Sequence, residues 1–516
     1  MIENRDVTDA AWFLVWPGLV LNGTNTIMAR AVAWRMAGLS LDREDPSPLV
    51  DQISRHVEAA IANGSLAPGG RLPSWRDLAA QLGVARGTVQ AAYERLSDRG
   101  LLVTAGSAGT RVVDPLPVKE ALATTTPSRQ DPRRGPDHAS AFQMGVPAHD
   151  AFPATLWSRL HRQGVQATSL WTGHSDGRGL SELRSALASH VAIARGITCS
   201  PEQIIVTSGF RAGLALAIRA MDVTGRQAWL EDPGYPVARL AVEVSGVVPI
   251  PVQIDEEGLS VRKGYELAPR AALAIVTPGQ QAPSGLTMTQ NRRSELVQWA
   301  SRSDAWIVED DYLAELHLSG RSANALASGG GADRVVHIGS FSKTISPLLG
   351  VGFLVAPERL VDRMIDVASW LGAPPNVAVQ LALARFLQEG HYLRHLRRMR
   401  RLYAQRQNCL LDALARREVH TAIPSGLSVL LPLPAKFDDQ RLSSEARDAG
   451  LGTAPLSPWF ATASRRSGLM LGIANVIERT IDRDCTRLLG LIADQTKKPA
   501  RWSHDDCFSR PSTFLR

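Results

Sequence analysis

A lysine in the second half of this chain stands in the setting typical of lysines that hold a cofactor. Lys343 follows a strand-like stretch within the run Val336–Thr344, and small hydroxyl residues, Ser342 and Thr344, lie on either side of it. A primary amine in a partly desolvated pocket loses its proton more easily and becomes a nucleophile. The run therefore predicts a cofactor-binding lysine.

The strand before Lys343 is one of a long series of alternating segments. Strand-like apolar runs alternate with helical patterns after about residue 140, and these runs lie at Gln203–Thr207, Ala228–Leu230, Ala272–Thr277, Trp306–Val308 and Val335–Gly339. The alternation predicts an α/β domain on a mostly parallel sheet. Asp310 follows the run Trp306–Val308, and Lys343 follows the run Val335–Gly339.

Composition excludes several classes of protein. The chain has 516 residues, 44 % of them hydrophobic, which is enough for two or more domains with a large core. Its net charge of +7 is compatible with a nucleic-acid partner. The four cysteines have no CxxC spacing, so we expect no disulfide framework, no metal site and a cytoplasmic location. The apolar run Ala11–Leu21 is too short to span a bilayer, so no membrane association is expected.

Changes in composition also predict the domain boundaries. A stretch rich in Pro, Thr and Arg, without apolar periodicity, separates two patterned regions and is typical of a linker. We expect an N-terminal extension at 1–45, a DNA-binding domain at 46–114, a linker at 115–140, an α/β domain at 141–494 and a polar tail at 495–516.

The region before the linker carries the pattern of a helix-turn-helix. Apolar residues recur every fourth position over 49–62, Ser74 can cap a short second helix, and a third helix is expected at about 85–99. After Gly100, the segment 101–112 predicts a β-hairpin wing with a glycine-rich tip.

This order of helices and wing closely resembles the GntR-type winged-helix domain over residues 48–113. The residues that the resemblance places at DNA are Arg76, Arg86, Thr88, Gln90, Gly109 and Thr110. The helical residues among them would contact phosphates and base edges, with the third helix in the major groove, whereas the wing residues would approach the minor groove or the backbone. A chain that combines this domain with a cofactor lysine is expected to be a sensor rather than an enzyme.

Spaced motifs in the α/β region resemble the fold-type-I aminotransferases. They include Gly177-Arg178-Gly179, Glu231-Asp232-Pro233-Gly234-Tyr235, Pro283-Ser284-Gly285, Glu309-Asp310-Asp311-Tyr312 and Ser340-Phe341-Ser342-Lys343. Joined to the upstream domain, the chain resembles the MocR group, the GntR-family branch with an aminotransferase-like effector domain. The resemblance implies a large subdomain with a mainly parallel mixed sheet, a smaller C-terminal α/β subdomain from about residue 370, pyridoxal 5′-phosphate as cofactor and a homodimer.

The same resemblance implies a role for each residue at the cofactor. Lys343 would form a Schiff base, Asp310 would pair with the pyridinium nitrogen, and Tyr312 would donate to the ring oxygen. Tyr235 would stack on the ring. The residues that would hold the phosphate are Ser208, Gly209, Phe210, Ser340 and Ser342.

The chain departs from the aminotransferase pattern at several positions. Gly350 stands where relatives have an arginine for the cofactor phosphate, and we expect Arg211, beside the phosphate turn, to replace it. Ala282 replaces an asparagine that contacts the ring oxygen in transaminases. Met470 and Val237 stand where relatives place arginines for a carboxylate. These departures make transamination a weaker hypothesis than sensing.

We therefore expect a cytoplasmic DNA-binding transcription regulator that senses pyridoxal 5′-phosphate, or an aldimine of it with an amine or amino-acid effector. Two alternatives stay open at this point. One is an active aminotransferase with an attached DNA-binding domain, and the other is a degenerate, cofactor-free dimerisation module.

Overall fold

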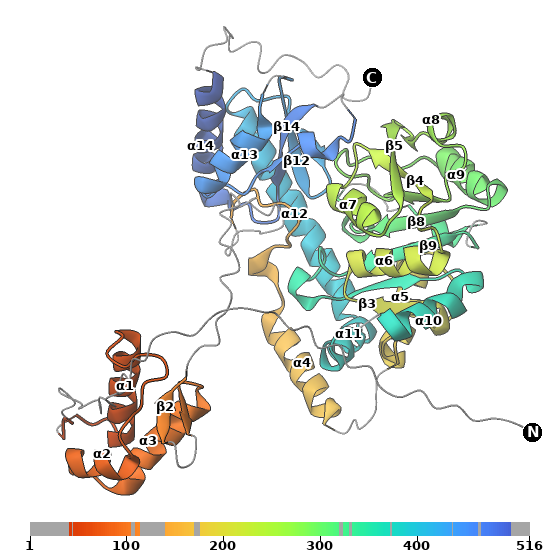
Figure 1. Cartoon of the computed structure of the whole chain (residues 1–516). Helices are drawn as coiled ribbons and strands as arrows, with labels where there is room; N and C mark the ends of the chain where they lie inside the picture. Colours follow the sequence, from red (N-terminus) through yellow and green to blue (C-terminus); the bar gives the residue numbers. More distant parts are fainter. Residues whose placement is uncertain are drawn as a thin grey trace, which may run out of the picture. The chain divides into compact units, whose positions relative to one another are not determined.

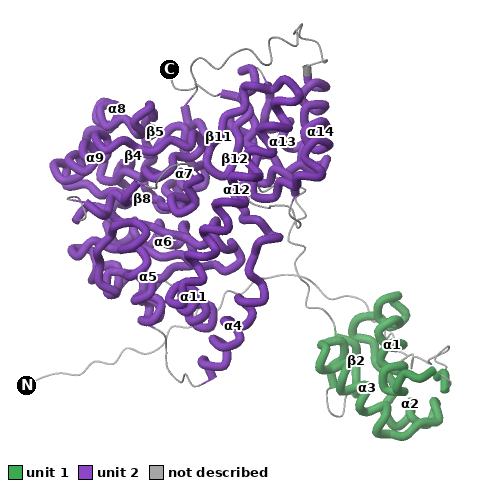
Figure 2. Tube along the Cα trace, turned by 180° about the vertical axis from the view of Figure 1, so that it is seen from behind, with its two compact units in different colours: residues 1–133 green, residues 134–516 purple. Residues whose placement is uncertain are grey.

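The protein is described from a computed structural model that covers residues 41–43, 45–104, 109–113, 140–169, 176–318, 323–329, 333–371, 374–435, 437–462 and 466–496. The chain divides into two compact units, residues 1–133 and 134–516 (Figure 2). Most of the expected N-terminal extension, linker and polar tail lies outside the described residues.

The first unit contains a helix-turn-helix and a small β-hairpin. Its elements are α1 (Leu49–Ala62), α2 (Trp75–Leu82), α3 (Arg86–Asp98), β1 (Leu102–Thr104) and β2 (Thr110–Val112). Ser74 caps α2, because its hydroxyl oxygen accepts a hydrogen bond from the Asp77 N–H at 3.2 Å. Ile53, Val89 and Leu96 are fully buried between the helices. The winged-helix expectation is confirmed.

An eight-stranded sheet forms the centre of the second unit, in the order β3-β10-β9-β8-β7-β4-β5-β6. The strands are β3 (Ile204–Thr207), β4 (Gln227–Asp232), β5 (Val248–Asp255), β6 (Gly258–Leu259), β7 (Leu273–Val276), β8 (Trp306–Asp311), β9 (Val335–Ser340) and β10 (Gly352–Val355). The pairs from β5 through β4, β7 and β8 to β9 are parallel, whereas β10 lies antiparallel between β3 and β9.

Helices cover both faces of this sheet (Figure 1). They are α4 (Ala154–Thr168), α5 (Ser181–Arg195), α6 (Phe210–Met221), α7 (Pro236–Val244), α8 (Val261–Leu267), α9 (Gln290–Arg302), α10 (Val361–Leu371) and α11 (Val377–Gln388). Side chains of α6, α7 and α10 pack with Leu230 and Ile275 on one face. Those of α5, α8, α9 and α11 share a cluster with Trp229 and Ala274 on the other face. Because neighbouring strand residues point to opposite faces, a strand covered on both faces needs successive apolar residues, as β7 has along its whole length.

A smaller subdomain follows on the long helix α12 (His391–Ala415), which runs between the two parts of the unit (Figure 1). Its other elements are β11 (Ile423–Ser425), β12 (Ser428–Leu433), α13 (Asp439–Asp448), β13 (Ala454–Pro455), β14 (Ser467–Gly472) and α14 (Glu478–Thr496). The four strands form an antiparallel sheet in the order β11-β12-β14-β13. Near the expected start of this subdomain at about residue 370, α10 packs on α6, and α11 packs on α4 and α5. The expected fold class is confirmed.

Candidate functional site

Lys343 lies in the turn after β9, at the edge of the sheet where the parallel strands end. In open α/β sheets this edge is where ligands bind. The Lys343 Nζ donates a hydrogen bond to the Gly145 carbonyl at 2.6 Å, so the segment before α4 closes one side of the site. Burial lowers the pKa of Lys343, and the charge of Asp310 opposes this shift. The amine is therefore held in place and predisposed to lose its proton.

The carboxyl group of Asp310 is buried near the end of β8. Its residue is 7 % exposed near the end of β8, and no other described residue donates a hydrogen bond to its side chain. Burial raises its pKa well above the ordinary value, the charges of Asp311 and Glu231 add to this, and Lys343 only partly offsets it. A cationic N–H placed against this carboxyl group would relieve the cost of burying it.

The residues on either side of Asp310 face the other way. Side chains alternate along a strand, so Glu309 and Asp311 point to the face opposite Asp310. Glu309 accepts a hydrogen bond from the Leu326 N–H at 2.8 Å and lies 3.0 Å from Nδ1 of His337. Asp311 pairs with the buried guanidinium of Arg195, on α5. Only Asp310 is left available for a ligand.

Two tyrosines lie close to Asp310. Tyr235 precedes α7, and its ring centroid lies 6.5 Å from that of Phe210 and 5.9 Å from that of Trp459. Burial raises the pKa of Tyr235, and the charge of Asp310 raises it further. The pKa of Tyr312 rises for the same two reasons. Both hydroxyl groups therefore stay protonated at neutral pH and can donate hydrogen bonds to an acceptor in the site.

The turn between β3 and α6 has the form of an anion site. Gly209 has a φ of 108°, a conformation that favours glycine, and a Cβ atom added there would meet nothing within 4 Å. Phe210 is the first residue of α6, and the first N–H groups of a helix have no partner within it. Ser208 and Arg211 are exposed beside them. Backbone donors and open space thus occur together here, as a phosphate requires.

Two serines lie next to Lys343. Ser340 is the last residue of β9, and Ser342 directly precedes the lysine. Their hydroxyl groups contact each other, and the Ser340 hydroxyl accepts a hydrogen bond from the Ser342 N–H at 3.2 Å. Both are half-buried, so they can offer hydroxyl donors to a ligand that reaches the lysine.

The structure shows what the departures from the aminotransferase pattern do. Gly350 adopts the left-handed conformation, with φ 58°, and has open space where a Cβ would lie. Met470 is 1 % exposed and packs with Leu430 and Leu456 inside the small subdomain, so it is a core residue. Gln281, which precedes Ala282, donates to the Pro233 carbonyl at 2.8 Å and is engaged within the fold.

Glu231 is a buried acid of the site to which the sequence analysis gave no role. It accepts hydrogen bonds from the Thr277 N–H at 3.1 Å and from the Thr277 hydroxyl at 2.6 Å. Burial nevertheless raises the pKa of Glu231 to about 7. Its position at the end of β4 was visible in the sequence, but no local pattern pairs it with Thr277.

The residue after Lys343 is fixed by the long helix α12. The Thr344 hydroxyl lies 3.1 Å from the Tyr392 hydroxyl, and the Thr344 carbonyl lies 2.8 Å from Nε2 of His395. Tyr392 donates to Glu315 at 2.5 Å, and Glu315 pairs with His190. No local pattern in the chain predicts this contact, because folding alone brings Thr344 and the helix together.

In the first unit, the N-terminal end of α3 is open to solvent. Arg86 and Gln90 are exposed, and Thr88 is half-buried. Arg76, on α2, is exposed with its guanidinium 4.7 Å from the centre of the Trp75 ring. These positions leave the end of α3 accessible to a groove of DNA.

The side chain of Thr110 lies inside the hairpin. Thr110 is 7 % exposed and its hydroxyl lies 3.5 Å from the Thr104 hydroxyl, so it belongs to the packing of the hairpin. Gly109 is half-buried beside the Arg71 guanidinium. Arg71, which is exposed, is therefore a polar side chain of this hairpin surface that the sequence analysis did not select.

Metal binding and membrane insertion find no support in the described parts of the chain. No cluster of three or more His, Cys, Asp or Glu residues there could hold a metal ion. No helix among these residues has the length and apolar character needed to cross a bilayer.

Both units match known families. Residues 49–112 match the bacterial regulatory proteins of the gntR family, and residues 143–463 match aminotransferase class I and II. The chain is 34 % identical over 465 residues to "Probable rhizopine catabolism regulatory protein MocR" of Rhizobium meliloti, covering 86 % of this chain and 93 % of that protein. It is 33 % identical over 448 residues to the HTH-type pyridoxine biosynthesis transcriptional regulator PdxR of Corynebacterium glutamicum, covering 86 % and 96 %.

A solved structure shows the same fold. LysN, an α-aminoadipate aminotransferase from Thermus thermophilus complexed with N-(5′-phosphopyridoxyl)-L-leucine, superposes with a TM-score of 0.61 at 25 % identity. The match covers 68 % of this chain and 92 % of that chain.

Proposed function

Because this chain belongs to the MocR-type members of the GntR family, regulators with an aminotransferase class I and II domain, we propose that it is a DNA-binding transcription regulator controlled by pyridoxal 5′-phosphate. In this proposal, the first unit binds an operator, and the second unit holds the cofactor and senses it alone or with an amine bound to it.

The pairing of Lys343 with Asp310 carries the proposal. Pyridoxal 5′-phosphate supplies an aldehyde that bonds to primary amines and a ring nitrogen that can be protonated. Lys343 offers an amine whose pKa is lowered by burial, and Asp310 offers a buried carboxyl group that has no donor of its own among the described residues. These two residues therefore fit the two reactive ends of this cofactor.

The remaining residues fit the rest of the group. Tyr312 can donate to the ring oxygen, and Tyr235 has an aromatic face for stacking. The first N–H groups of α6, from Phe210 onward, and the hydroxyl groups near them suit a phosphate. With glycine at 350, we propose Arg211 as the cation at the phosphate, since it is close enough to Tyr235 to lower the pKa of that tyrosine.

Regulation would follow from linkage between the two units. A ligand that binds one arrangement of the protein more tightly shifts the population toward it, and affinity for DNA changes with that population. We propose that the regulator acts as a homodimer, so that two copies of α3 meet two half-sites of an operator. Met470 in a closed apolar cluster supports a sensor over a transaminase, because no carboxylate can reach that position.

The visible spectrum of the protein with added pyridoxal 5′-phosphate tests this function. We expect wild type to show the absorbance of a lysine-bound cofactor, Lys343→Ala to lose it, and Lys263→Ala to keep it as the matched control, because Lys263 lies at the surface and contacts Gln253. DNA binding, measured by fluorescence anisotropy on the natural promoter region, should change when the cofactor is added to wild type. Equal spectra for wild type and Lys343→Ala would overturn the proposal.

The phosphate assignment needs its own measurement. Losing one charge-assisted contact typically weakens binding roughly tenfold to a hundredfold. Arg211→Ala should therefore bind the cofactor that much more weakly in a spectral titration, whereas the exposed Arg219→Ala on the same helix should not. Unchanged affinity in Arg211→Ala would mean that Arg211 does not take the place of the phosphate-binding arginine that relatives have at position 350.

A further inference from the structure

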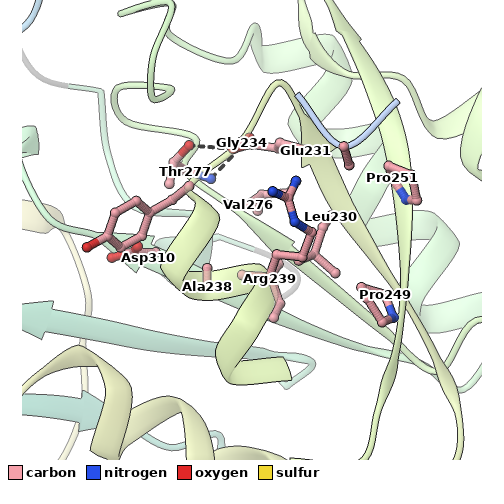
Figure 3. Close-up of a pocket in the computed structure, with 13 residues that line it drawn as sticks. Leu230, Glu231, Gly234, Ala238, Arg239, Pro249, Pro251, Val276, Thr277 and Asp310 are labelled. Carbon is pink, nitrogen blue, oxygen red and sulfur yellow. Dashed lines mark hydrogen bonds between the residues drawn. The ribbon is translucent and has the colours of Figure 1, made fainter. Parts of the chain in front are cut away.

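Two cavities lie on opposite faces of the sheet near the end of β8. The first has lining residues from α7, and Figure 3 shows it with Asp310 and Thr277 among the residues around it. The second has lining residues from α5, and its polar side chains include His190, Thr344 and Tyr392. It therefore lies behind the turn that carries Lys343, on the face away from Asp310.

Tyr392, near the start of α12, connects this turn to a buried ion pair. Its hydroxyl lies 3.1 Å from the Thr344 hydroxyl and donates to Glu315 at 2.5 Å. Glu315 in turn pairs with His190, and the ring of His190 packs against the ring of Tyr392 with 5.1 Å between the centroids. Tyr392 and Thr344 are both buried. A chain of direct contacts thus runs from His190 to the residue after Lys343.

The chemistry of these groups sets the direction of the hydrogen bonds. Burial raises the pKa of Glu315, but the charge of His190 more than offsets this, so the pKa lies below its ordinary value and the carboxylate is ionised at neutral pH. A carboxylate can only accept, and a phenol has a single hydrogen, so the hydrogen of Tyr392 goes to Glu315. The Tyr392 oxygen is then left to accept from the Thr344 hydroxyl. Without it, that hydroxyl has only a 3.5 Å contact with the Phe341 carbonyl.

Lys343 is restrained from both of its ends. Nε2 of His395 lies 2.8 Å from the Thr344 carbonyl, and since a carbonyl can only accept, this nitrogen carries the hydrogen. His395 follows Tyr392 by three residues, so the two side chains share one face of α12. At the far end of the lysine, Nζ donates to the Gly145 carbonyl at 2.6 Å. The backbone beside Lys343 and its amine are therefore both held before any ligand arrives.

We propose that Tyr392 is a positioning residue for Lys343 and that it acts through its contact with the Thr344 hydroxyl. This inference rests on the proposed function. An amine bonds to an aldehyde carbon with the release of one water, so the lysine must be held where that carbon will lie. A turn that is fixed in advance loses less conformational freedom when the bond forms. Binding of an aldehyde should therefore depend on Tyr392, whereas binding through a ring and a phosphate alone should not.

Two forms of the cofactor separate positioning from general damage to the site. Pyridoxal 5′-phosphate has an aldehyde to which Lys343 can bond, whereas pyridoxamine 5′-phosphate has the same ring and phosphate with an amine in its place. Tyr392→Phe keeps the ring that packs on His190 and Phe341 and removes only the hydroxyl. In titrations followed by tryptophan fluorescence, this variant should bind the aldehyde form roughly twofold to tenfold more weakly than wild type, as expected for one neutral hydrogen bond. It should bind the amine form as wild type does.

Substitutions of Thr344 test the same contact from its other side. Thr344→Val keeps the shape of the side chain without the hydroxyl and should match Tyr392→Phe, whereas Thr344→Ser keeps the hydroxyl and should behave as wild type. The double variant Tyr392→Phe/Thr344→Val should be no weaker than either single variant, because both changes remove one contact. Tyr93→Phe is the matched control, since Tyr93 is a buried tyrosine of the first unit that donates to the Pro73 carbonyl at 3.0 Å. It should bind both forms as wild type does.

The outcomes distinguish this inference from the proposed function. The positioning role is overturned, and the cofactor proposal stands, if Tyr392→Phe binds the aldehyde form as tightly as wild type or loses affinity equally for both forms. A Thr344→Ser protein as weak as Thr344→Val, or a double variant whose loss is the sum of the two single losses, overturns it as well. Should Tyr392→Phe fail to fold, the two Thr344 variants decide by the same criteria. Wild type without the absorbance of a lysine-bound cofactor would overturn the proposed function itself, and this inference with it.

Discussion

Replacing Glu231 by glutamine should make the protein more stable at neutral and alkaline pH. Glu231 is buried in the fold, and burial raises its pKa from the ordinary 4.5 to about 7. The folded protein therefore holds a proton that the unfolded chain has already released between these two pH values. By linkage, this group makes stability fall as pH rises from 4.5 to 7, and the whole loss is present above pH 7. Glutamine is neutral throughout and does not contribute such a loss.

The size of the effect follows from the same pKa. A difference between 4.5 and about 7 corresponds to roughly 3 kcal/mol at 1.36 kcal/mol per pH unit. The amide keeps an acceptor for the Thr277 N–H but meets the Gln281 amide less well, which costs about 1 kcal/mol. We therefore expect Glu231→Gln to gain about 2 kcal/mol over wild type at pH 8 and to lose that advantage near pH 4.5.

Urea unfolding at several pH values, followed by tryptophan fluorescence, measures this difference. Glu266→Gln is the matched control, because Glu266 is 57 % exposed in an ion pair with Arg262 on one helix. It should track wild type at every pH, since such surface pairs contribute little. A Glu231→Gln protein that is less stable than wild type at pH 8, or that shows the same pH dependence, would refute the reasoning.

Two further outcomes follow from the structure. Arg195→Met should destabilise the second unit by about 3 to 5 kcal/mol in urea unfolding, because Asp311 is left buried without its guanidinium partner, whereas Arg262→Met should cost less than about 0.5 kcal/mol. Similar costs for the two would contradict this account of the buried pair. Arg86→Gln should weaken DNA binding and reduce the slope of log affinity against log salt by about 1 if the arginine meets a phosphate, while Arg99→Gln, at the far end of α3, should leave the slope unchanged. A slope that stays the same in Arg86→Gln would place this residue away from the phosphates.

Local sequence patterns predicted much of the fold because most elements carry their own signal. The helix-turn-helix follows from apolar spacing and the cap at Ser74, and β8 follows from its continuous apolar run. The strand β5 was not predicted, because Pro249 and Pro251 interrupt its apolar pattern. It tolerates both because it lies near one edge of the sheet, where it pairs with β4 and only briefly with β6.

Only part of the candidate site could be predicted from the sequence. Asp310 and Lys343 could be selected from strand ends and a family resemblance, since each role depends on a short run of residues. The partnership of Glu231 with Thr277 joins different strands, and the support of Thr344 by Tyr392 joins a turn to a helix. Such pairs form only when the chain folds, so no spacing along the chain predicts them.

The contact between Thr344 and α12 connects the turn that carries Lys343 to the small subdomain. Tyr392 and His395 hold Thr344 at the first turns of this helix, while its later turns pack on α14 and β12. A helix of 25 residues is about 37 Å long at 1.5 Å per residue. A tilt of about 5° around its first turn would therefore move its far end by about 3 Å. Any movement of Thr344 that tilted this helix would therefore be larger at the far end of the helix than at the residue beside Lys343.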